Sequence, residues 1–182
     1  MSKKKALITG VTGQDGAYLA KFLLDKGYEV VGGERQNASG SLWRLEELGI
    51  TKKIRVIPFE LLEENIINNV VRIGQYDEIY NLAAQSFVGI SYDTPIFTSN
   101  VNALGVTRIL EAIRNFSKST KFYQASTSEM YGNTISKKQN ETSHFQPVSP
   151  YAASKLYAHW LVNIYREAYN LYCCSGILFN HE

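Results

Sequence analysis

The chain has 182 residues, of which 45% are hydrophobic and 20% are charged, and its formal net charge is +2. This length suits one domain with a buried core, and the small net charge gives no reason to expect a nucleic-acid or membrane partner. No apolar run reaches membrane-spanning length, and the basic start lacks the apolar segment of a signal peptide, so we expect a cytoplasmic protein. The adjacent cysteines, Cys173 and Cys174, and the 3 histidines lack metal-ligand spacing, so neither a metal site nor a disulfide framework is predicted.

The first predicted unit is a strand, a glycine-rich turn and a helix. An apolar strand at Lys5–Thr9 is followed by Gly10, Gly13 and Gly16, and the helical pattern then stops at Gly27. Glycines let the backbone turn tightly and approach a pyrophosphate, whose charge the helix N-terminus stabilises. The spacing is one residue wider than Gly-x-Gly-x-x-Gly, and a plain glycine turn is the alternative, but the flanking strand and helix favour a dinucleotide site.

The second predicted strand, at residues 29–32, leads into Glu34 and Arg35. At this point of a dinucleotide-binding fold, an acidic side chain binds the adenosine ribose of NAD, whereas an arginine accepts the 2′-phosphate of NADP. The chain offers both residues, so the local chemistry leaves the two cofactors open. A solvated loop position is the alternative for one of the two residues.

Strands and helices continue to alternate along the rest of the chain. Further strands are predicted at residues 54–57, 78–82, 121–125 and 171–179, and helices at residues 42–48, 63–73, 97–116 and 151–169. This alternation predicts an α/β fold with a doubly wound, parallel, Rossmann-like sheet. No linker or internal repeat interrupts the pattern, so residues 1–182 are predicted to form one dinucleotide-binding domain.

Small and polar residues follow two of the predicted strands. Ala83 and Ala84 come after the strand at 78–82 and leave room for a ligand at its carboxyl end, although tight packing requires the same residues. The strand at 121–125 is followed by the polar run Ser126-Thr127-Ser128-Glu129, at the edge of the sheet where binding groups gather. The alternative is that these side chains only satisfy backbone groups in a turn.

Ser149 and Pro150 predict the start of the helix at 151–169, as its N-cap and first helical residue. Tyr151 and Lys155 then lie one turn apart on the same helix face. Free tyrosine titrates near ~10, and a cation about 4 Å away at an effective dielectric of ~20 is worth about 4 kcal/mol. We therefore expect Lys155 to lower the pKa of Tyr151 toward neutral pH, where acid–base catalysis is most effective. The pair alone is weak evidence, because this helix contains other tyrosines.

Together these motifs resemble the extended short-chain dehydrogenase/reductases and, within them, the GDP-mannose 4,6-dehydratase family. Besides the Tyr151-x-x-x-Lys155 pair, the resemblance is carried by four runs: Gly13-Gln14-Asp15-Gly16-Ala17-Tyr18-Leu19-Ala20, Asn81-Leu82-Ala83-Ala84-Gln85-Ser86, Tyr123-Gln124-Ala125-Ser126-Thr127-Ser128-Glu129 and Gly176-Ile177-Leu178-Phe179-Asn180-His181-Glu182. Ser128 favours this family, because the related dTDP-glucose dehydratases have aspartate there. The resemblance spans essentially the whole chain, whereas family members continue well past it. A C-terminal substrate domain is therefore expected to be largely absent from this chain.

The resemblance implies a hydro-lyase that converts GDP-mannose to GDP-4-keto-6-deoxymannose by internal hydride transfer and loss of water. It implies that Tyr151 takes the C4 hydroxyl proton, that Glu129 acts as base at C5 and acid at C6, and that Thr127 holds the 4-oxygen. Lys155 is implied to bind the nicotinamide ribose. Three alternatives stay open: an epimerase or reductase, a dehydratase of another GDP-sugar such as a GDP-heptose, and a non-catalytic nucleotide-binding module.

The resemblance also implies NADP as the cofactor, with NAD as the alternative. The family usually has paired basic residues after the second strand, where this chain has Glu34-Arg35-Gln36, and we expect NADP on the basis of Arg35 with Glu34 turned outward. The implied cofactor contacts are Gly10, Thr12, Gly13, Gln14, Asp15, Gly16, Arg35, Glu60, Leu61, Leu82, Ala83, Gln85, Ser86, Lys155 and His181, and the implied substrate contacts are Ser86, Ser128 and Asn180. The expected partners are a nucleotide-sugar substrate and further copies of the chain, in a homodimer or homotetramer formed through the apolar helices at 97–116 and 151–169.

Overall fold

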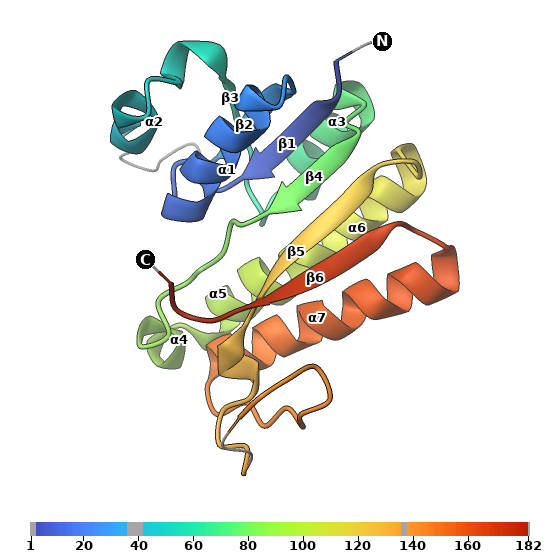
Figure 1. The fold of residues 1–182 in the computed structure, drawn as a ribbon. Coiled ribbons are helices and arrows are strands. Elements are labelled where there is room, and N and C mark those ends of the chain that lie inside the picture. Colours follow the sequence, from blue (N-terminus) through green and yellow to red (C-terminus); the bar gives the residue numbers. More distant parts are fainter. Residues whose placement is uncertain (1–2, 36–41, 136–137, 182) are drawn as a thin grey trace.

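The computed structural model describes residues 3–35, 42–135 and 138–181. Within these residues, six strands form one parallel sheet in the order β3-β2-β1-β4-β5-β6 (Figure 1). The strands are β1 (Lys5–Thr9), β2 (Glu29–Glu34), β3 (Arg55–Pro58), β4 (Glu78–Asn81), β5 (Lys121–Thr127) and β6 (Cys173–Leu178). The predicted doubly wound parallel fold is confirmed. Gln36 and Glu182, which belong to two of the motifs above, lie outside the described residues.

Helices cover both faces of the sheet (Figure 1). They are α1 (Gln14–Asp25), α2 (Trp43–Glu47), α3 (Glu64–Gly74), α4 (Ile90–Asp93), α5 (Pro95–Ser99), α6 (Gly105–Phe116) and α7 (Pro150–Tyr169). A buried cluster that includes Ile8 and Leu45 joins α1 and α2 to one face, and a second that includes Leu7 and Val162 joins α3, α6 and α7 to the other. Because Leu7 and Ile8 are adjacent, they point to opposite faces of β1. No helix in the described part of the chain is long and apolar enough to cross a membrane.

Some element boundaries differ from those predicted. β2 runs on to Glu34 and β5 runs on to Thr127, because Glu34 pairs with Pro58 of β3 and Thr127 pairs with Leu178 of β6. The helix predicted at 97–116 is instead α5, a π-helical segment (Asn100–Leu104) and α6. Both strand extensions carry a polar side chain to the edge of the sheet.

The order of the strands places a crevice at the carboxyl end of β1. β1 lies between β2 and β4, so the direction of winding reverses at this strand. Ligands of doubly wound sheets bind outside the carboxyl ends of the strands at this reversal. Thr9 ends β1 and leads into the glycine turn, and Asn81 ends β4 and leads into the small residues. The fold therefore brings two of the predicted motifs to the same edge.

Candidate active site

The turn after β1 requires glycine at two positions. Gly10 has a φ of +69°, a left-handed conformation that residues with side chains rarely adopt. A Cβ on Gly16 would lie 2.3 Å from the carbonyl oxygen of Gly10, so α1 can begin this close to the turn only without a side chain there. Gly13 is the N-cap of α1 and supplies no side-chain cap. The first N–H groups of α1 are therefore left for a ligand or for water.

A cavity of about 400 Å³ follows the carboxyl ends of β1 to β4. The predicted cofactor contacts that line it are Gly10, Thr12, Gly13, Arg35, Glu60, Leu61, Leu82, Ala83, Gln85 and Ser86. A smaller cavity shares Gly10, Gly13 and Leu82 with the first and adds Gln14, Asp15, Gly16 and Ala125. The fold thus brings together predicted residues from separate stretches of the chain.

The apolar wall of the larger cavity was missed by the sequence analysis. The residues concerned are Phe59, Phe87, Phe97 and Val101, with Gly33 beside them. Phe59 directly follows β3, just as Gly10 directly follows β1. Position directly after a strand end is therefore the signal that identifies Phe59, whereas Val101 lies within the helix predicted at 97–116 and carries no such signal.

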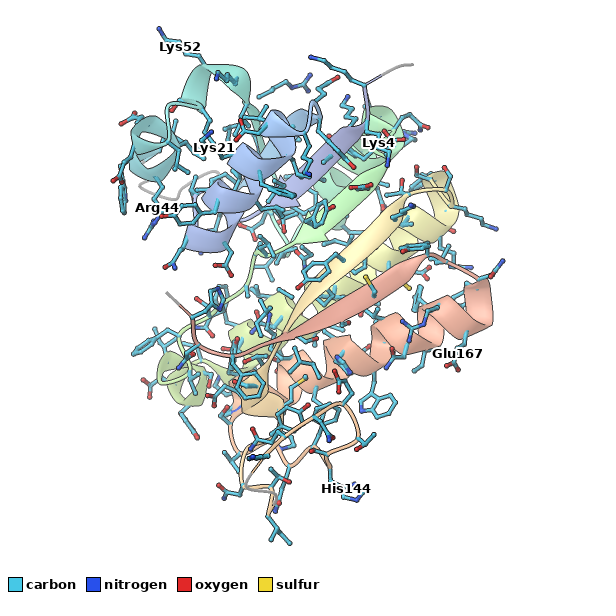
Figure 2. All side chains as sticks on the ribbon, viewed as in Figure 1. Lys4, Lys21, Arg44, Lys52, His144 and Glu167 are labelled. Atoms are coloured by element: carbon cyan, nitrogen blue, oxygen red, sulfur yellow. The ribbon has the colours of Figure 1, made fainter. Side chains whose placement is uncertain are left out.

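The Glu34 carboxylate faces the glycine turn. Its Oε2 accepts a hydrogen bond from Thr12 Oγ1 at 2.5 Å, and its Oε1 accepts one from the backbone N–H of Arg35 at 3.1 Å. Glu34 is half-buried and lines the larger cavity, whereas Arg35 is exposed. The expectation that Glu34 turns outward is therefore wrong, because the Thr12 hydroxyl holds its carboxylate at the cavity. Arg44 of α2 (Figure 2) donates from Nη1 to the Thr12 carbonyl oxygen at 3.2 Å.

A buried chain of hydrogen bonds joins the strands beneath this edge. Thr9 Oγ1 donates to Asn81 Oδ1 at 2.6 Å, and Asn81 Nδ2 donates to Gln124 Oε1 at 2.8 Å. The Ala125 carbonyl oxygen then accepts from Gln124 Nε2 at 2.9 Å and from Lys155 Nζ at 2.8 Å. The end of β1 and α7 are therefore connected through buried polar groups. Thr9 and Gln124 carry no sequence signal that predicts this connection.

The loop after β4 is held by the π-helical segment. Asn102 Nδ2 donates to the Gln85 carbonyl oxygen at 2.9 Å, and Asn102 Oδ1 accepts from the Gln85 N–H at 2.8 Å. Single π-helical turns within α-helices frequently occur at functional sites. The sequence analysis predicted a continuous helix here, because its apolar spacing does not reveal a π-helical turn, and it missed Asn102.

The predicted catalytic side chains lie together where β5 ends and α7 begins. The predicted helix start is confirmed, since Ser149 Oγ accepts from the Ala152 N–H at 3.0 Å. The Tyr151 hydroxyl lies close enough to the Thr127 side chain and to the Glu129 carboxylate for both to affect its pKa. The Glu129 N–H donates to Thr127 Oγ1 at 3.2 Å. Tyr151 is 8% exposed and Glu129 is exposed, so a buried phenol lies near an accessible carboxylate.

Burial is the main cause of the pKa shifts of Tyr151 and Lys155. Burial raises the pKa of Tyr151, while the hydrogen bond with Thr127 lowers it and the Glu129 carboxylate raises it. The expectation that Lys155 lowers the pKa of Tyr151 is wrong for this structure. The Lys155 Nζ lies 5.9 Å from the centroid of the Tyr151 ring and donates to Ala125 instead. Burial lowers the pKa of Lys155 itself to about 8.

The predicted contacts after β6 lie on an exposed segment. His181 Nδ1 donates to the Phe179 carbonyl oxygen at 2.8 Å, and its Nε2 lies 2.9 Å from Asp15 Oδ1. Both contacts raise the pKa of His181 and bring the end of β6 to the glycine turn. Ser128 begins the 3₁₀ turn that contains Glu129, and neither it nor Asn180 lines the two cavities.

Comparison with known proteins identifies the family. A model of the GDP-mannose 4,6 dehydratase family matches residues 7–182. The chain belongs to this family. It is 49% identical to a GDP-mannose 4,6-dehydratase of Vibrio cholerae, over 99% of this chain and 50% of that protein. It is 47% identical to the GDP-mannose 4,6 dehydratase of Homo sapiens, over 97% of this chain and 50% of that protein. The chain thus spans about half the length of the curated relatives it matches.

Solved structures of related sugar-nucleotide enzymes share the fold of this GDP-mannose 4,6-dehydratase family member. A UDP-glucose 4-epimerase from Brucella ovis in complex with NAD has a TM-score of 0.86 at 22% identity, over 97% of this chain and 52% of that chain. A dTDP-glucose 4,6-dehydratase from Streptomyces venezuelae with NAD bound has a TM-score of 0.82 at 24% identity, over 94% of this chain and 54% of that chain. At these identities the likeness concerns the fold alone.

Proposed function

We propose that this protein is a dehydratase that removes water from GDP-mannose and forms GDP-4-keto-6-deoxymannose. The observation that carries the proposal is the convergence of Tyr151, Thr127 and Glu129 at the end of β5. The names of the Vibrio cholerae and human relatives support the reaction and the substrate. We further propose that residues 1–182 form the dinucleotide-binding domain with its catalytic residues. Most of the sugar-nucleotide pocket would then belong to the half of the relatives' length that this chain does not span.

A nicotinamide dinucleotide is the proposed cofactor. The fit rests on the α1 N-terminus without a side-chain cap and on the cavity of about 400 Å³ beside it. When bound, the cofactor would take a hydride from C4 of the sugar and return it to C6, so that no net oxidation results. The residues proposed to hold it are the predicted contacts that line the two cavities, together with Lys155 and His181. Arg35 supports NADP, which the family resemblance favours, and Glu34 supports NAD.

The proton transfers are assigned to the cluster at the end of β5. Tyr151 Oη is proposed to accept the proton of the C4 hydroxyl as the tyrosinate, and Thr127 Oγ1 to hold the same sugar oxygen. The positive charge of a bound oxidised nicotinamide would favour the tyrosinate and so oppose the effect of burial, which raises the pKa of Tyr151. Glu129 removes the C5 proton, which the new C4 ketone acidifies, and then gives a proton to the hydroxyl that leaves C6 as water. The proton that returns to C5 when C6 is reduced is balanced by the proton that Tyr151 took from the C4 hydroxyl, so the overall change is the loss of one water. One carboxylate can serve both steps because the first leaves it protonated for the second.

Substrate contacts and self-association complete the proposal. Ser86, Ser128 and Asn180 are proposed to contact the substrate, since each follows a strand that ends at this edge of the sheet. A homodimer or homotetramer is proposed to form through the outer faces of α5, α6 and α7. On α7 the large apolar side chains of Tyr157 and Trp160 are 45% and 54% exposed, which favours such an interface.

An assay of the complete protein with GDP-mannose tests the reaction. With catalytic NADP⁺ or NAD⁺, we expect a 4-keto-6-deoxy sugar nucleotide and no accumulation of the reduced dinucleotide. Steady accumulation of the reduced form would identify a simple dehydrogenase instead. A change of configuration without loss of water would identify an epimerase.

Replacement of Glu129 tests the assigned roles separately. Glu129→Gln keeps the shape of the side chain but removes the base, so elimination should fall by about 10²- to 10⁴-fold. Oxidation at C4 should persist and be visible as reduced dinucleotide in a single turnover. Glu167→Gln, an exposed change at the outer end of α7 (Figure 2), is the matched control and should behave as the unmodified protein. Equal loss of oxidation and elimination in Glu129→Gln contradicts the assignment of Glu129 to the elimination step.

A further inference from the structure

The end of β2 carries a carboxylate at the position where the adenosine ribose of a dinucleotide is recognised. Glu34 is the last residue of β2, and it lines the larger cavity together with Gly10, Thr12 and Gly13 of the glycine turn. In dinucleotide-binding folds this position distinguishes the ribose 2′-hydroxyl of NAD from the 2′-phosphate of NADP. The inference below rests on the proposed dinucleotide function and concerns which of the two cofactors is bound.

The hydrogen bonds of Glu34 fix its carboxylate without exhausting its capacity to accept. Oε2 accepts from Thr12 Oγ1 and Oε1 accepts from the Arg35 N–H, one hydrogen bond to each oxygen. A carboxylate has about four acceptor positions. The Arg35 N–H is adjacent to Glu34 in the sequence and the Thr12 hydroxyl comes from the glycine turn, and the carboxylate that they hold lines the cavity. The remaining acceptor positions suit a hydroxyl donor such as a ribose 2′-hydroxyl and do not suit a phosphate, whose oxygens are mostly unprotonated acceptors at neutral pH.

The charges around Glu34 also favour a ribose 2′-hydroxyl over a 2′-phosphate. No basic side chain in the described ranges lies within ion-pair distance of its carboxylate. A phosphate monoester carries about −1.5 to −2 charges at pH 7, so a 2′-phosphate would meet an unpaired negative charge at close range. Arg44 donates to the Thr12 carbonyl oxygen and stacks over Trp43 at 4.3 Å. The Arg35 side chain is exposed, where water and salt screen its attraction for a phosphate.

We propose that Glu34 is a specificity-determining residue that makes this protein prefer NAD(H) over NADP(H). Thr12 is its positioning residue, because the Thr12 hydroxyl holds the carboxylate at the cavity. This preference replaces the NADP expectation, which requires Glu34 to turn outward and leave Arg35 to bind the cofactor. The departure from the paired basic residues usual in the family therefore has a direct consequence for the cofactor.

Binding titrations of the complete protein with NADH and NADPH test the proposal without reference to turnover. We expect a dissociation constant for NADH at least about tenfold below that for NADPH, which corresponds to about 1.4 kcal/mol. Glu34→Gln keeps the shape of the side chain and removes its charge. It should therefore reduce the ratio of the NADPH to the NADH dissociation constant about fivefold or more, mainly through tighter binding of NADPH. Glu29→Gln, at the exposed opposite end of the same strand, is the matched control and should leave the ratio unchanged.

The outcomes separate this inference from the proposed function. Tighter binding of NADPH than NADH by the unmodified protein overturns the role of Glu34 but leaves a dinucleotide-dependent dehydratase intact. An unchanged ratio in Glu34→Gln, with a thermal unfolding midpoint like that of the unmodified protein, also overturns it. Failure of both dinucleotides to bind overturns the inference together with the proposed function. A narrowed ratio in Glu34→Gln but not in Glu29→Gln supports it.

Discussion

At the glycine turn, Gly10 and Gly16 shape the wall of the site because they have no side chain. At the α7 end, the groups are the side chains of Tyr151, Lys155 and Glu129, and burial shifts the pKa values of Tyr151 and Lys155. A substitution of a turn glycine therefore acts through shape, whereas a substitution of Tyr151 or Lys155 acts through charge and solvation. The comparison predicts that the two ends respond to mutation in different ways.

The two ends are also physically connected. The side chains of Thr9, Asn81 and Gln124 form a buried hydrogen-bonded chain from the end of β1 to the carbonyl oxygen that holds Lys155. Buried polar groups are costly unless they are fully hydrogen-bonded, so this chain holds the strand ends in one register. The connection fixes the distance between the ends and leaves their separate chemistries intact.

Lys155→Met should give the largest effect on stability and turnover, and it tests the role of burial at the α7 end. The pKa of this lysine is lowered to about 8 from 10.5, and this difference corresponds to about 3 kcal/mol. Because the folded-state pKa of Lys155 is lowered, the protein has its full stability above pH 10.5, where the lysine is neutral in both states. It loses about this amount of stability as the pH falls from 10.5 through 8. Methionine avoids burial of a charge, so we expect a free energy of unfolding up to ~3 kcal/mol higher at pH 7. Turnover should be lost in the same variant.

Denaturant unfolding at pH 7 and pH 10 measures this change. The gain in stability of Lys155→Met over the unmodified protein should be larger at pH 7 than at pH 10. Lys53→Met, at an exposed position in the 3₁₀ turn Thr51–Lys53, is the control and should show no such pH dependence. A variant that is less stable than the unmodified protein at both pH values would show that the hydrogen bond to Ala125 outweighs the cost of burial.

Gly16→Ala gives the next largest effect and tests the glycine-turn end. A Cβ at this position would lie 2.3 Å from the Gly10 carbonyl oxygen and 2.8 Å from Val11 Cα, so the backbone must move. Overpacking of this kind costs about 1–3 kcal/mol of stability. Because the displaced backbone lines the smaller cavity, we expect the dissociation constant for the dinucleotide to rise about tenfold or more. Calorimetric titration and thermal unfolding measure the two effects, and unchanged binding would disprove this account of the turn.

The glycine-turn end was the more predictable of the two from the sequence. Gly10 and Gly13 stand between an apolar strand and an amphipathic helix, with Gly16 in the first turn of that helix. This local order is enough to predict the turn and its position at the sheet edge. The N-cap at Ser149 was predictable for the same reason, because capping depends on neighbours within one helical turn. Strand alternation predicted the parallel sheet, since it is a property of the whole pattern.

What the sequence could not supply depends on contacts between distant residues. The direction of Glu34 is set by Thr12, which lies 22 residues earlier in the turn between β1 and α1. The role of Asn102 depends on a π-helical segment, and apolar spacing does not reveal one. The raised pKa of Tyr151 comes from burial beneath the completed fold, so the spacing of Tyr151 and Lys155 alone gave the wrong direction.

Replacement of His159 or His181 should give the smallest effect, a change in how the free energy of unfolding depends on pH at each end of the site. His159 of α7 has its Nδ1 3.0 Å from Ser126 Oγ, and burial and the charge of Arg166 lower its pKa. The stability that His159 contributes is therefore present above pH 6.5 and is lost as the pH falls through its folded-state pKa. His181, beside Asp15 at the glycine turn, has a raised pKa, so its stabilisation is present below pH 6.5 and is lost as the pH rises through its folded-state pKa. We therefore expect His159→Gln to reduce the loss of stability between pH 7.5 and pH 5, and His181→Gln to increase it. Urea unfolding at the two pH values measures both changes. Changes of the same sign would show that the pKa values of His159 and His181 are not shifted in opposite directions.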